Sequence, residues 1–435
     1  MSNKYKKWIH LPEHYPLVVG DTFELFYRGI IHCSNPYKYN IKVTCKKGNA
    51  YMKKFVFTPT EDDIGEIPLS IELSDDYGQV LDSASVTLKV NPAAKSPVRP
   101  LNVICVGAST TAGGQWPSEC NRRLTANDSD LAEAPAAPNA SVPPQGLGLE
   151  NIRFIGGKEG KYGTFYEGYG GWRFDSYNSE HLASSFRYIK TDHNKTDSDR
   201  HSTYTDGITE WKLEEIEDGR IKLIRTKGKE PLNDSGTLKH VSGGLDNSDI
   251  VYTEVAPASG NPFWNAKEAR VDFSGYCKRI GADGIDVCIT LLGWNSWSSY
   301  EGQIKEQVRL FINNLRADYP ECRIILLGIN PPSTDGLAVS YGASWNFVEK
   351  FGFVMNLNKW YTEIAAEFEN VYFVSTAGQF DLENNFPTVD RPKNCRVDSL
   401  ETIQSNGVHP TYNGYMQIAD AAFRQLNELI IKDFN

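Results

Sequence analysis

The chain has no long apolar run, no closely paired cysteines and no surplus of positive charge, and each absence excludes a class of protein. No segment approaches 18 consecutive apolar residues, so we expect no membrane-spanning helix and no membrane partner. The N-terminal stretch MSNKYKKWIHLPEHYP has no continuous apolar core, so we expect no signal peptide in this chain. Cytoplasm, virion and export after removal of a leader stay open as locations. The formal net charge of −10 argues against a nucleic-acid partner.

Metal-binding patterns are also missing. The eight cysteines form no CxxC pair, which argues against a zinc knuckle, and both free thiols and a Cys33–Cys45 bridge stay open. The polar stretch DHNKTDSDRHS (192–202) lacks the carboxylate spacing and final glutamate of an EF-hand. We therefore predict a solvated loop there, and neither a metal nor an organic cofactor.

The composition changes near residue 97, which predicts two domains. Residues 1–97 contain runs of alternating apolar and polar residues, typical of a small Ig-like β-sandwich, and the proline-containing linker NPAAKSPVRP (91–100) follows. Residues 98–435 instead contain apolar runs separated by helix-like stretches, which predict an α/β domain with a parallel sheet. The predicted strands are LNVICV (101–106), NIRFIG (151–156), IDVCITLLG (285–293), CRIILLGI (322–329) and VYFVS (371–375).

Three of the intervening stretches have helical periodicity. In the first, Ile304, Val308, Phe311, Ile312 and Leu315 share one face. The predicted helices occupy 301–320, 355–370 and 414–431.

One polar stretch, from about 178 to 262, interrupts the α/β alternation. It contains WKLEEIEDGRIKLIR, in which Asp218-Gly219 joins two alternating runs and predicts a β-hairpin. We expect an insertion with its own small β element. A second interruption, APAAPNASVPPQG (134–146), is rich in proline and alanine and predicts a loop.

The first buried strand ends in GASTTAGG (107–114), at the edge where parallel sheets bind ligands. This turn lacks the lysine of a phosphate-binding loop, and Thr111 occupies the last glycine position of a GxSxG elbow. By itself, Ser109 is more typical of a helix cap or turn residue than of a nucleophile.

Three further stretches supply the other components of acyl-transfer chemistry. YEGYGGWRF (166–174) is a glycine-rich turn, LLGWNSW (291–297) places Asn295 after a buried strand, and SNGVHPTYNGYMQIAD (405–420) places His409 before a helix. A serine, a late histidine and separate hydrogen-bond donors are the nucleophile, base and oxyanion hole that such chemistry needs.

In this order the four blocks resemble those of the SGNH (GDSL-type) serine hydrolases, and the sequence between them is similar to a carbohydrate-esterase-like subgroup. The resemblance implies a three-layer flavodoxin-like sheet, with Ser109 as nucleophile and His409 as base. It also implies oxyanion donors from the N–H of Ser109, from Gly168 (Gly170 or Gly171 in a shifted register) and from the Asn295 side chain.

Two departures from the family's pattern change the expected mechanism. Ala108 replaces the aspartate before the nucleophile, and Asn406 replaces the aspartate three residues before the histidine. An amide at Asn406 can orient an imidazole but cannot stabilise its charge. The resemblance implies that a Ser–His dyad with a backbone carbonyl holding the ring can also work, so we expect an active, dyad-like enzyme. Ser296 is a further, smaller departure.

The expected substrate is an O-acylated, chiefly O-acetylated, glycan or a small ester. Trp172, Trp294 and Trp297 lie beside the block residues, where they either form a wall for a sugar or pack in the core. The alternative is a catalytically impaired glycan-binding protein or phage-tail or virion component built on an esterase scaffold.

Overall fold

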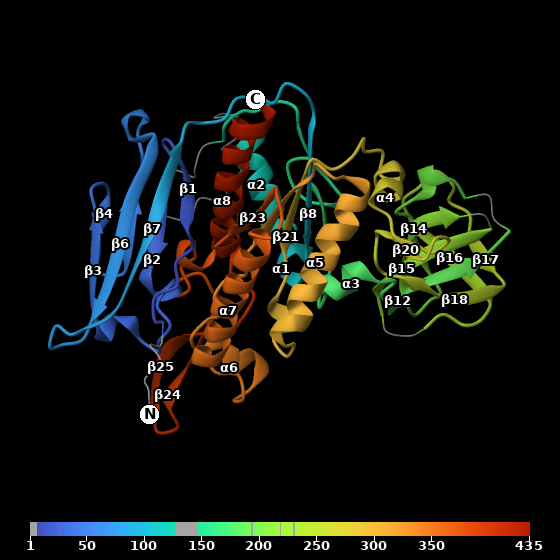
Figure 1. Ribbon diagram of the computed structural model, residues 1–435. Coiled ribbons are helices and arrows are strands. Elements are labelled where there is room, and N and C mark those ends of the chain that lie inside the picture. Colours follow the sequence, from blue (N-terminus) through green and yellow to red (C-terminus); the bar gives the residue numbers. More distant parts are fainter. Residues whose placement is uncertain (1–6, 128–145, 193–194, 218, 229–230) are drawn as a thin grey trace. The chain divides into compact units, whose positions relative to one another are not determined.

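The computed structural model describes residues 7–127, 146–192, 195–217, 219–228 and 231–435 (Figure 1). Most of the predicted loop at 134–146 and the turn residue Asp218 lie outside these ranges. The chain divides into two compact units, one formed by Met1–Phe174 with Cys277–Asn435 and the other by Asp175–Tyr276. The second unit encloses the predicted insertion, while the domain boundary near residue 97 stays a prediction.

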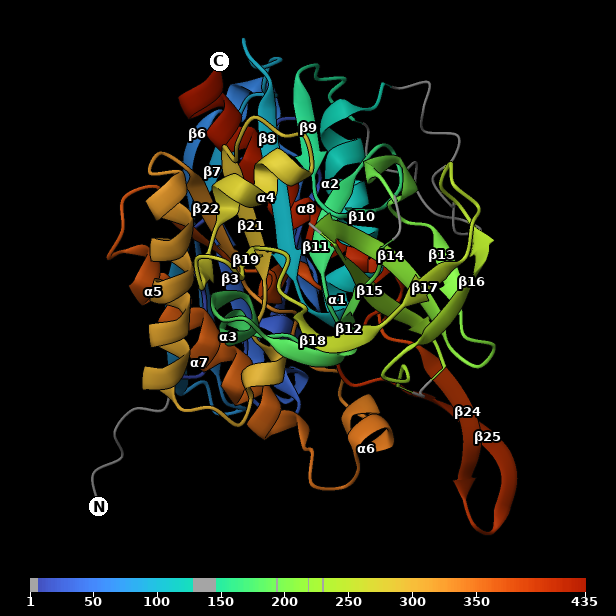
Figure 2. The same cartoon turned by 90° about the vertical axis from the view of Figure 1, so that its right-hand side faces the viewer.

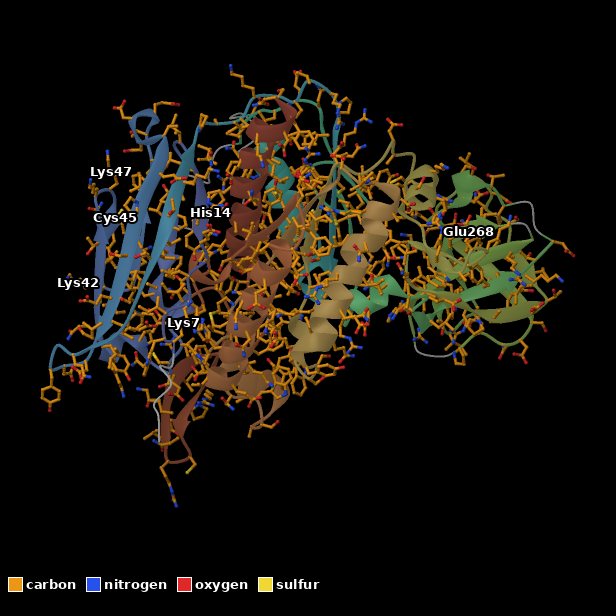
Figure 3. All side chains as sticks on the ribbon, viewed as in Figure 1. Lys7, His14, Lys42, Cys45, Lys47 and Glu268 are labelled. Atoms are coloured by element: carbon orange, nitrogen blue, oxygen red, sulfur yellow. The ribbon has the colours of Figure 1, made fainter. Side chains whose placement is uncertain are left out.

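Two antiparallel-rich sheets form the N-terminal part of the larger unit. One has the order β1-β7-β6-β3 and the other β2-β5-β4, and apolar side chains from both fill one core that includes Phe23, Phe55 and Ile71. Lys42 and Cys45 lie on the edge strand β3 (Figure 3), where a lysine discourages pairing with another chain. The strands are β1 His14–Val18, β2 Phe23–Phe26, β3 Asn40–Cys45, β4 Asn49–Ala50, β5 Lys54–Phe57, β6 Gly65–Ser74 and β7 Val80–Asn91.

A mainly parallel sheet forms the centre of the larger unit, which makes this a mixed α/β fold. β9 and β11 both pair with the same strand, β8, and β21, β22 and β23 follow in that order. All five predicted strands are confirmed. The apolar runs reflect burial on both faces, and every residue of β8 and β21 is buried. The strands are β8 Leu101–Gly107, β9 Ile152–Ile155, β10 Lys158–Glu159, β11 Phe165–Gly168, β21 Val287–Leu291, β22 Arg323–Leu327 and β23 Val371–Val374.

Two pairs of helices accompany this sheet. α2 (Gln115–Thr125) packs on α8 (Tyr412–Leu429), and α5 (Glu301–Asp318) packs on α7 (Phe347–Ala365). Figure 1 shows α8 and α5 on opposite sides of the sheet, with α8 on the side of the N-terminal strands. The apolar face predicted for α5 is the buried one. None of the helices in the described residues combines the length and apolar composition needed to cross a bilayer.

A buried ionic cluster links the N-terminal strands to α2 and α8. Asp21 lies in the turn between β1 and β2, and its two carboxylate oxygens accept hydrogen bonds from Arg123 of α2 and Arg424 of α8, each at 2.6 Å. Burial alone raises the pKa of a carboxyl, but the two guanidinium groups outweigh it and lower the pKa of Asp21. The linker that follows β7 also packs on α8, since the N–H of Ala94 donates to the Asn427 side chain at 2.8 Å.

The smaller unit is a seven-stranded sheet with the order β17-β16-β13-β14-β15-β12-β18 and a separate core that includes Tyr204 and Trp211. The predicted hairpin is confirmed, since β14 (Glu210–Glu217) pairs with β15 (Arg220–Lys227) in antiparallel register. The remaining elements are β12 Leu182–Lys190, β13 Thr203–Thr205, β16 Gly236–Ser242, β17 Ile250–Tyr252, β18 Glu254–Ser259, β19 Trp264–Asn265 and β20 Arg270–Val271. Helix α3 (Phe174–Asn178) lies where the chain enters this unit, and helix α4 (Phe273–Arg279) lies where the chain leaves it.

A short helix and a β-hairpin near the C-terminus were not predicted. A short helix, α6 (Gly336–Tyr341), follows β22, and the hairpin of β24 (Thr388–Asn394) and β25 (Val397–Gln404) precedes the His409 segment. Figure 2 shows this hairpin projecting from the rest of the larger unit. Its exposed strands alternate too weakly between apolar and polar residues to be recognised in the sequence.

Candidate active site

The serine turn lies at the carboxyl end of two neighbouring parallel strands. β8 ends at Gly107, Ser109 is the first residue of the short helix α1 (Ser109–Ala112), and Gly107 pairs with Leu291 at the end of β21. Asn295 therefore follows the strand next to the one that Ser109 follows. This edge, where loops emerge from a parallel sheet, is where such sheets bind ligands.

His409 completes a hydrogen-bonded pair with Ser109. Its Nε2 atom lies 2.8 Å from the Ser109 Oγ atom, and both side chains are half-buried. Burial lowers the pKa of His409 and favours the neutral imidazole. In the tautomer protonated at Nδ1, Nε2 accepts the hydroxyl proton, as a general base must.

Asn406 lies in the same loop but contacts its backbone. The Asn406 Oδ1 atom accepts hydrogen bonds from the N–H groups of Val408 at 3.0 Å and of His409 at 2.8 Å. Within the described residues, no group accepts a hydrogen bond from Nδ1 of the His409 ring. The expected orientation of the imidazole by the Asn406 side chain is therefore not seen, and Asn406 fixes the turn that carries the ring.

The loop after β22 supports the histidine turn, and the sequence analysis missed it. Asn330 is fully buried, and its Nδ2 atom donates to the carbonyl of Val408 at 3.0 Å. The N–H of Ser333 donates to the carbonyl of Gly407 at 3.1 Å. The only signal in the sequence was a polar residue, Asn330, directly after an apolar strand.

Asn295 meets the glycine-rich turn. Its Nδ2 atom donates to the carbonyl of Trp172 at 3.0 Å, and Gly171 precedes that tryptophan with a φ of +83°, a conformation that favours glycine. Gly168 has a different environment, because it ends β11 and packs against α1. A Cβ atom there would lie 2.8 Å from the backbone of Thr111 and Ala112. The structure thus places Gly171 in the turn whose Trp172 carbonyl binds Asn295, and Gly168 against the serine helix.

A buried carboxylate binds a residue of the glycine-rich turn. Glu167 is fully buried and accepts hydrogen bonds from the N–H of Gly157 at 2.6 Å and from the Tyr169 hydroxyl at 2.7 Å. The Tyr169 ring stacks on Trp172 with 4.3 Å between centroids. Glu167 is therefore connected, through Tyr169, to the residue whose carbonyl binds Asn295. Sequence reasoning did not identify this carboxylate.

The three tryptophans proposed to contact substrate differ in exposure. Trp172 and Trp294 are each 6% exposed, whereas Trp297 is 42% exposed. Packing accounts for the first two, and only Trp297 presents much of its ring to solvent. Within the described ranges, no group of three or more His, Cys, Asp or Glu residues is arranged to hold a metal ion, and all eight cysteines are free thiols.

Neither a family model nor a curated protein sequence matches the chain. Similar solved structures include two family 3 carbohydrate esterases. The Clostridium thermocellum enzyme is 12% identical with a TM-score of 0.35, and the Talaromyces cellulolyticus enzyme is 14% identical with a TM-score of 0.31. Each alignment covers 77% of this chain and 100% of the other. A peptidoglycan O-acetylesterase is 12% identical, with 77% and 92% covered and a TM-score of 0.34. TM-scores this low define no activity for this chain.

Proposed function

We propose that the chain is a serine ester hydrolase that works through a Ser–His dyad. The observation that carries the proposal is the 2.8 Å contact between the Ser109 hydroxyl and Nε2 of a His409 whose neutral form is favoured by burial. A hydroxyl within hydrogen-bond reach of an unprotonated imidazole is the arrangement that activates a serine nucleophile.

In the proposed mechanism, His409 Nε2 takes the Ser109 proton as Oγ attacks the ester carbonyl carbon. The tetrahedral intermediate collapses when the imidazolium gives that proton to the leaving alcohol, which leaves an acyl group on Ser109. Water then attacks the acyl-enzyme with His409 again as base, and the acid is released. Since no carboxylate among the described residues contacts the ring, the proposed imidazolium intermediate lacks the charge partner of a triad.

The oxyanion is proposed to receive three hydrogen bonds. One comes from the N–H of Ser109, which has no intrahelical partner because it is at the first position of α1. The second comes from the Asn295 amide. For the third we favour the N–H of Gly171 over that of Gly168, because Gly171 lies in the turn that Asn295 contacts, whereas Gly168 packs against α1.

The assignment of the two domains to specific fold families is also a proposal. β8 pairs in parallel with β9, β11 and β21. With the short strand β11 left aside, the order β9-β8-β21-β22-β23 is 2-1-3-4-5, which is the flavodoxin-like order and supports an SGNH hydrolase domain at 98–435. The two packed sheets before residue 97 support an Ig-like sandwich.

The proposed substrate is an O-acylated, chiefly O-acetylated, glycan, and the exposed indole of Trp297 close to Asn295 supports it. One observation favours the alternative of a catalytically impaired glycan-binding or virion component: Asn406 does not contact the imidazole that it would have to orient.

Hydrolysis of p-nitrophenyl acetate by the full chain tests the proposal. We expect turnover by the wild type and near-background rates for Ser109→Ala. A Ser109→Ala variant within a few-fold of the wild type would remove Ser109 from the mechanism, and a wild type without turnover would favour the impaired protein.

A further inference from the structure

Three aromatic side chains cluster where the loops after β21 and β22 meet. Trp345 stacks on Tyr341 with 4.5 Å between centroids and 24° between planes, and it meets Trp297 edge-on at 4.8 Å. Tyr341 and Trp297 are 39% and 42% exposed, whereas Trp345 is half-buried between them. We call Trp297, Tyr341 and Trp345 the aromatic wall.

A buried lysine holds the wall together. Lys350 begins the second turn of α7 and is almost fully buried, with Nζ 3.9 Å from the Trp297 ring centroid and 4.5 Å from that of Trp345. A cation desolvated over two indoles is strongly attracted to both. The Glu349 carboxylate lies 3.1 Å from the same Nζ and balances its charge. The wall is thus fixed in place and presents no unbalanced cation.

The wall is connected to two of the segments that form the candidate site. Trp297 is two residues beyond Asn295 in the loop after β21. On the other side, Ser340, which precedes Tyr341, accepts a hydrogen bond from the N–H of Gly407 at 3.1 Å and donates to the carbonyl of Ser405 at 3.0 Å. α6 is therefore bonded to the turn that carries His409, and Trp297 continues the loop that carries Asn295.

We infer that the aromatic wall is a subsite that binds an uncharged sugar residue next to the acylated one. This inference rests on the proposed esterase function and specifies its substrate as an ester on an oligosaccharide or polysaccharide. Exposed aromatic faces bind the C–H faces of a pyranose ring. The two exposed rings, those of Trp297 and Tyr341, are rigid, so they can bind in this way with little loss of conformational freedom. Because Glu349 balances Lys350, the wall has no free charge to hold a uronate carboxylate.

Kinetics on matched substrates test the subsite. Chemically acetylated xylohexaose is expected to contact the wall and the reacting groups together, whereas acetylated methyl xyloside and p-nitrophenyl acetate are expected to contact only the reacting groups. We expect the wild type to have a KM at least about tenfold lower for the hexaose than for the methyl xyloside, equivalent to about 1.4 kcal/mol. Tyr341→Ala and Trp345→Ala should abolish most of that difference, with a loss on the hexaose at least about fivefold larger than on p-nitrophenyl acetate.

Two control variants separate stacking from general damage. Tyr341→Phe keeps the ring and should retain the low KM for the hexaose. Tyr77→Ala removes a tyrosine that is 97% exposed in the turn between β6 and β7, and it should match the wild type on all substrates. Equal KM values for the hexaose and the methyl xyloside, or equal losses on all esters in the wall variants, would overturn the inference. The inference would also be overturned if longer acyl chains, and not added sugars, lowered the KM of the wild type. The wall would then bind the acyl group.

A binding measurement distinguishes failure of the subsite from failure of the esterase. Ser109→Ala with an intact wall should bind acetylated xylohexaose, detected by calorimetry, at least about tenfold more tightly than the Ser109→Ala/Tyr341→Ala double variant. Equal binding by the two proteins overturns the subsite, even where the wild type hydrolyses p-nitrophenyl acetate. Loss of hydrolysis of every ester, with the binding difference intact, overturns the esterase and not the subsite.

Discussion

The Ser109 hydroxyl and the His409 imidazole lie 2.8 Å apart although 300 residues separate them in the chain. Two features of the fold bring them together. Ser109 follows the central strand β8, and His409 occupies a turn that Asn330 and Ser333 of the loop after β22 hold by hydrogen bonds. The loops after β8 and β22, which leave the same edge of the parallel sheet, therefore support the pair, and each can be tested separately.

Removing the Asn295 side-chain amide should slow catalysis with little effect on folding. We expect Asn295→Ala to lower kcat for p-nitrophenyl acetate by about 10²–10³-fold, because one donor to the oxyanion is lost. Asn49→Ala, on the exposed strand β4, is the control and should match the wild type. A reduction of less than about threefold would exclude Asn295 from the oxyanion hole.

The pH at which kcat/KM has fallen to half of its maximum on the acid side should lie below the ordinary pKa of histidine. Burial lowers the pKa of His409, so the neutral, basic form persists to lower pH than in a free histidine with a pKa of about 6.5. As pH falls through the lowered pKa, the imidazole becomes protonated and kcat/KM should decline. A plot of kcat/KM against pH reports this group in the free enzyme, and a midpoint above about 6.5 would contradict the prediction.

The two roles open to Asn406 predict different variant behaviour. Asn406→Ala removes the acceptor for two backbone N–H groups, so the His409 turn should loosen and kcat should fall. Asn406→Asp keeps an acceptor oxygen and adds a negative charge near the ring, so it should retain activity and move the acid limb to higher pH. If Asn406→Ala matches the wild type in kcat, the turn does not depend on this side chain.

Breaking the ionic cluster between the β layers and the helices should destabilise the larger unit. Asp21→Ala leaves the buried Arg424 without its carboxylate partner and Arg123 with Asp420 alone, and we expect a loss of about 3–5 kcal/mol in the free energy of unfolding. Urea titration measures the loss, and Asp62→Asn on the surface should change stability by less than about 0.5 kcal/mol. Similar midpoints for both variants would show that the cluster contributes little.

His10 should make stability fall in mildly acidic solution. Burial, helped by the charge of Lys7, lowers the pKa of His10 to about 4 in the folded chain, whereas an unfolded histidine has a pKa of about 6.5. Between these values the unfolded chain binds more protons, so acidification should reduce the free energy of unfolding by at most about 1.4 kcal/mol per pH unit. Urea titrations at several pH values should show a smaller slope for His10→Gln, and an unchanged slope would contradict this.

The sequence predicts the parts of this molecule that follow a simple periodicity. The strands β8 and β21 are apolar because both faces are covered, and the α5 face from Ile304 to Leu315 repeats with the helical period. The sequence did not predict helix α2, because this helix buries three charged residues, Glu119, Arg122 and Arg123. In a hydropathy pattern, charged residues indicate an exposed face. Their partners, such as Asp21, lie far away in the chain.

The candidate-site residues that lie next to a helix or strand could be predicted from the sequence. Ser109, Asn295 and His409 follow or precede regular elements, so their types and order were visible in the sequence. Glu167 and Asn330 were not, since each acts through a hydrogen bond to a turn formed by a distant segment. The preference for Gly171 over Gly168 likewise depends on packing against α1, which no local pattern encodes.

Covalent labelling tests the reactive pair most directly. The full chain would be treated with a fluorophosphonate, digested and analysed by mass spectrometry, with His409→Ala treated in parallel. The dyad predicts a phosphonyl adduct on the peptide that contains Ser109, and its loss when His409 is replaced. Absence of an adduct at Ser109, or equal labelling of the two proteins, would contradict the account.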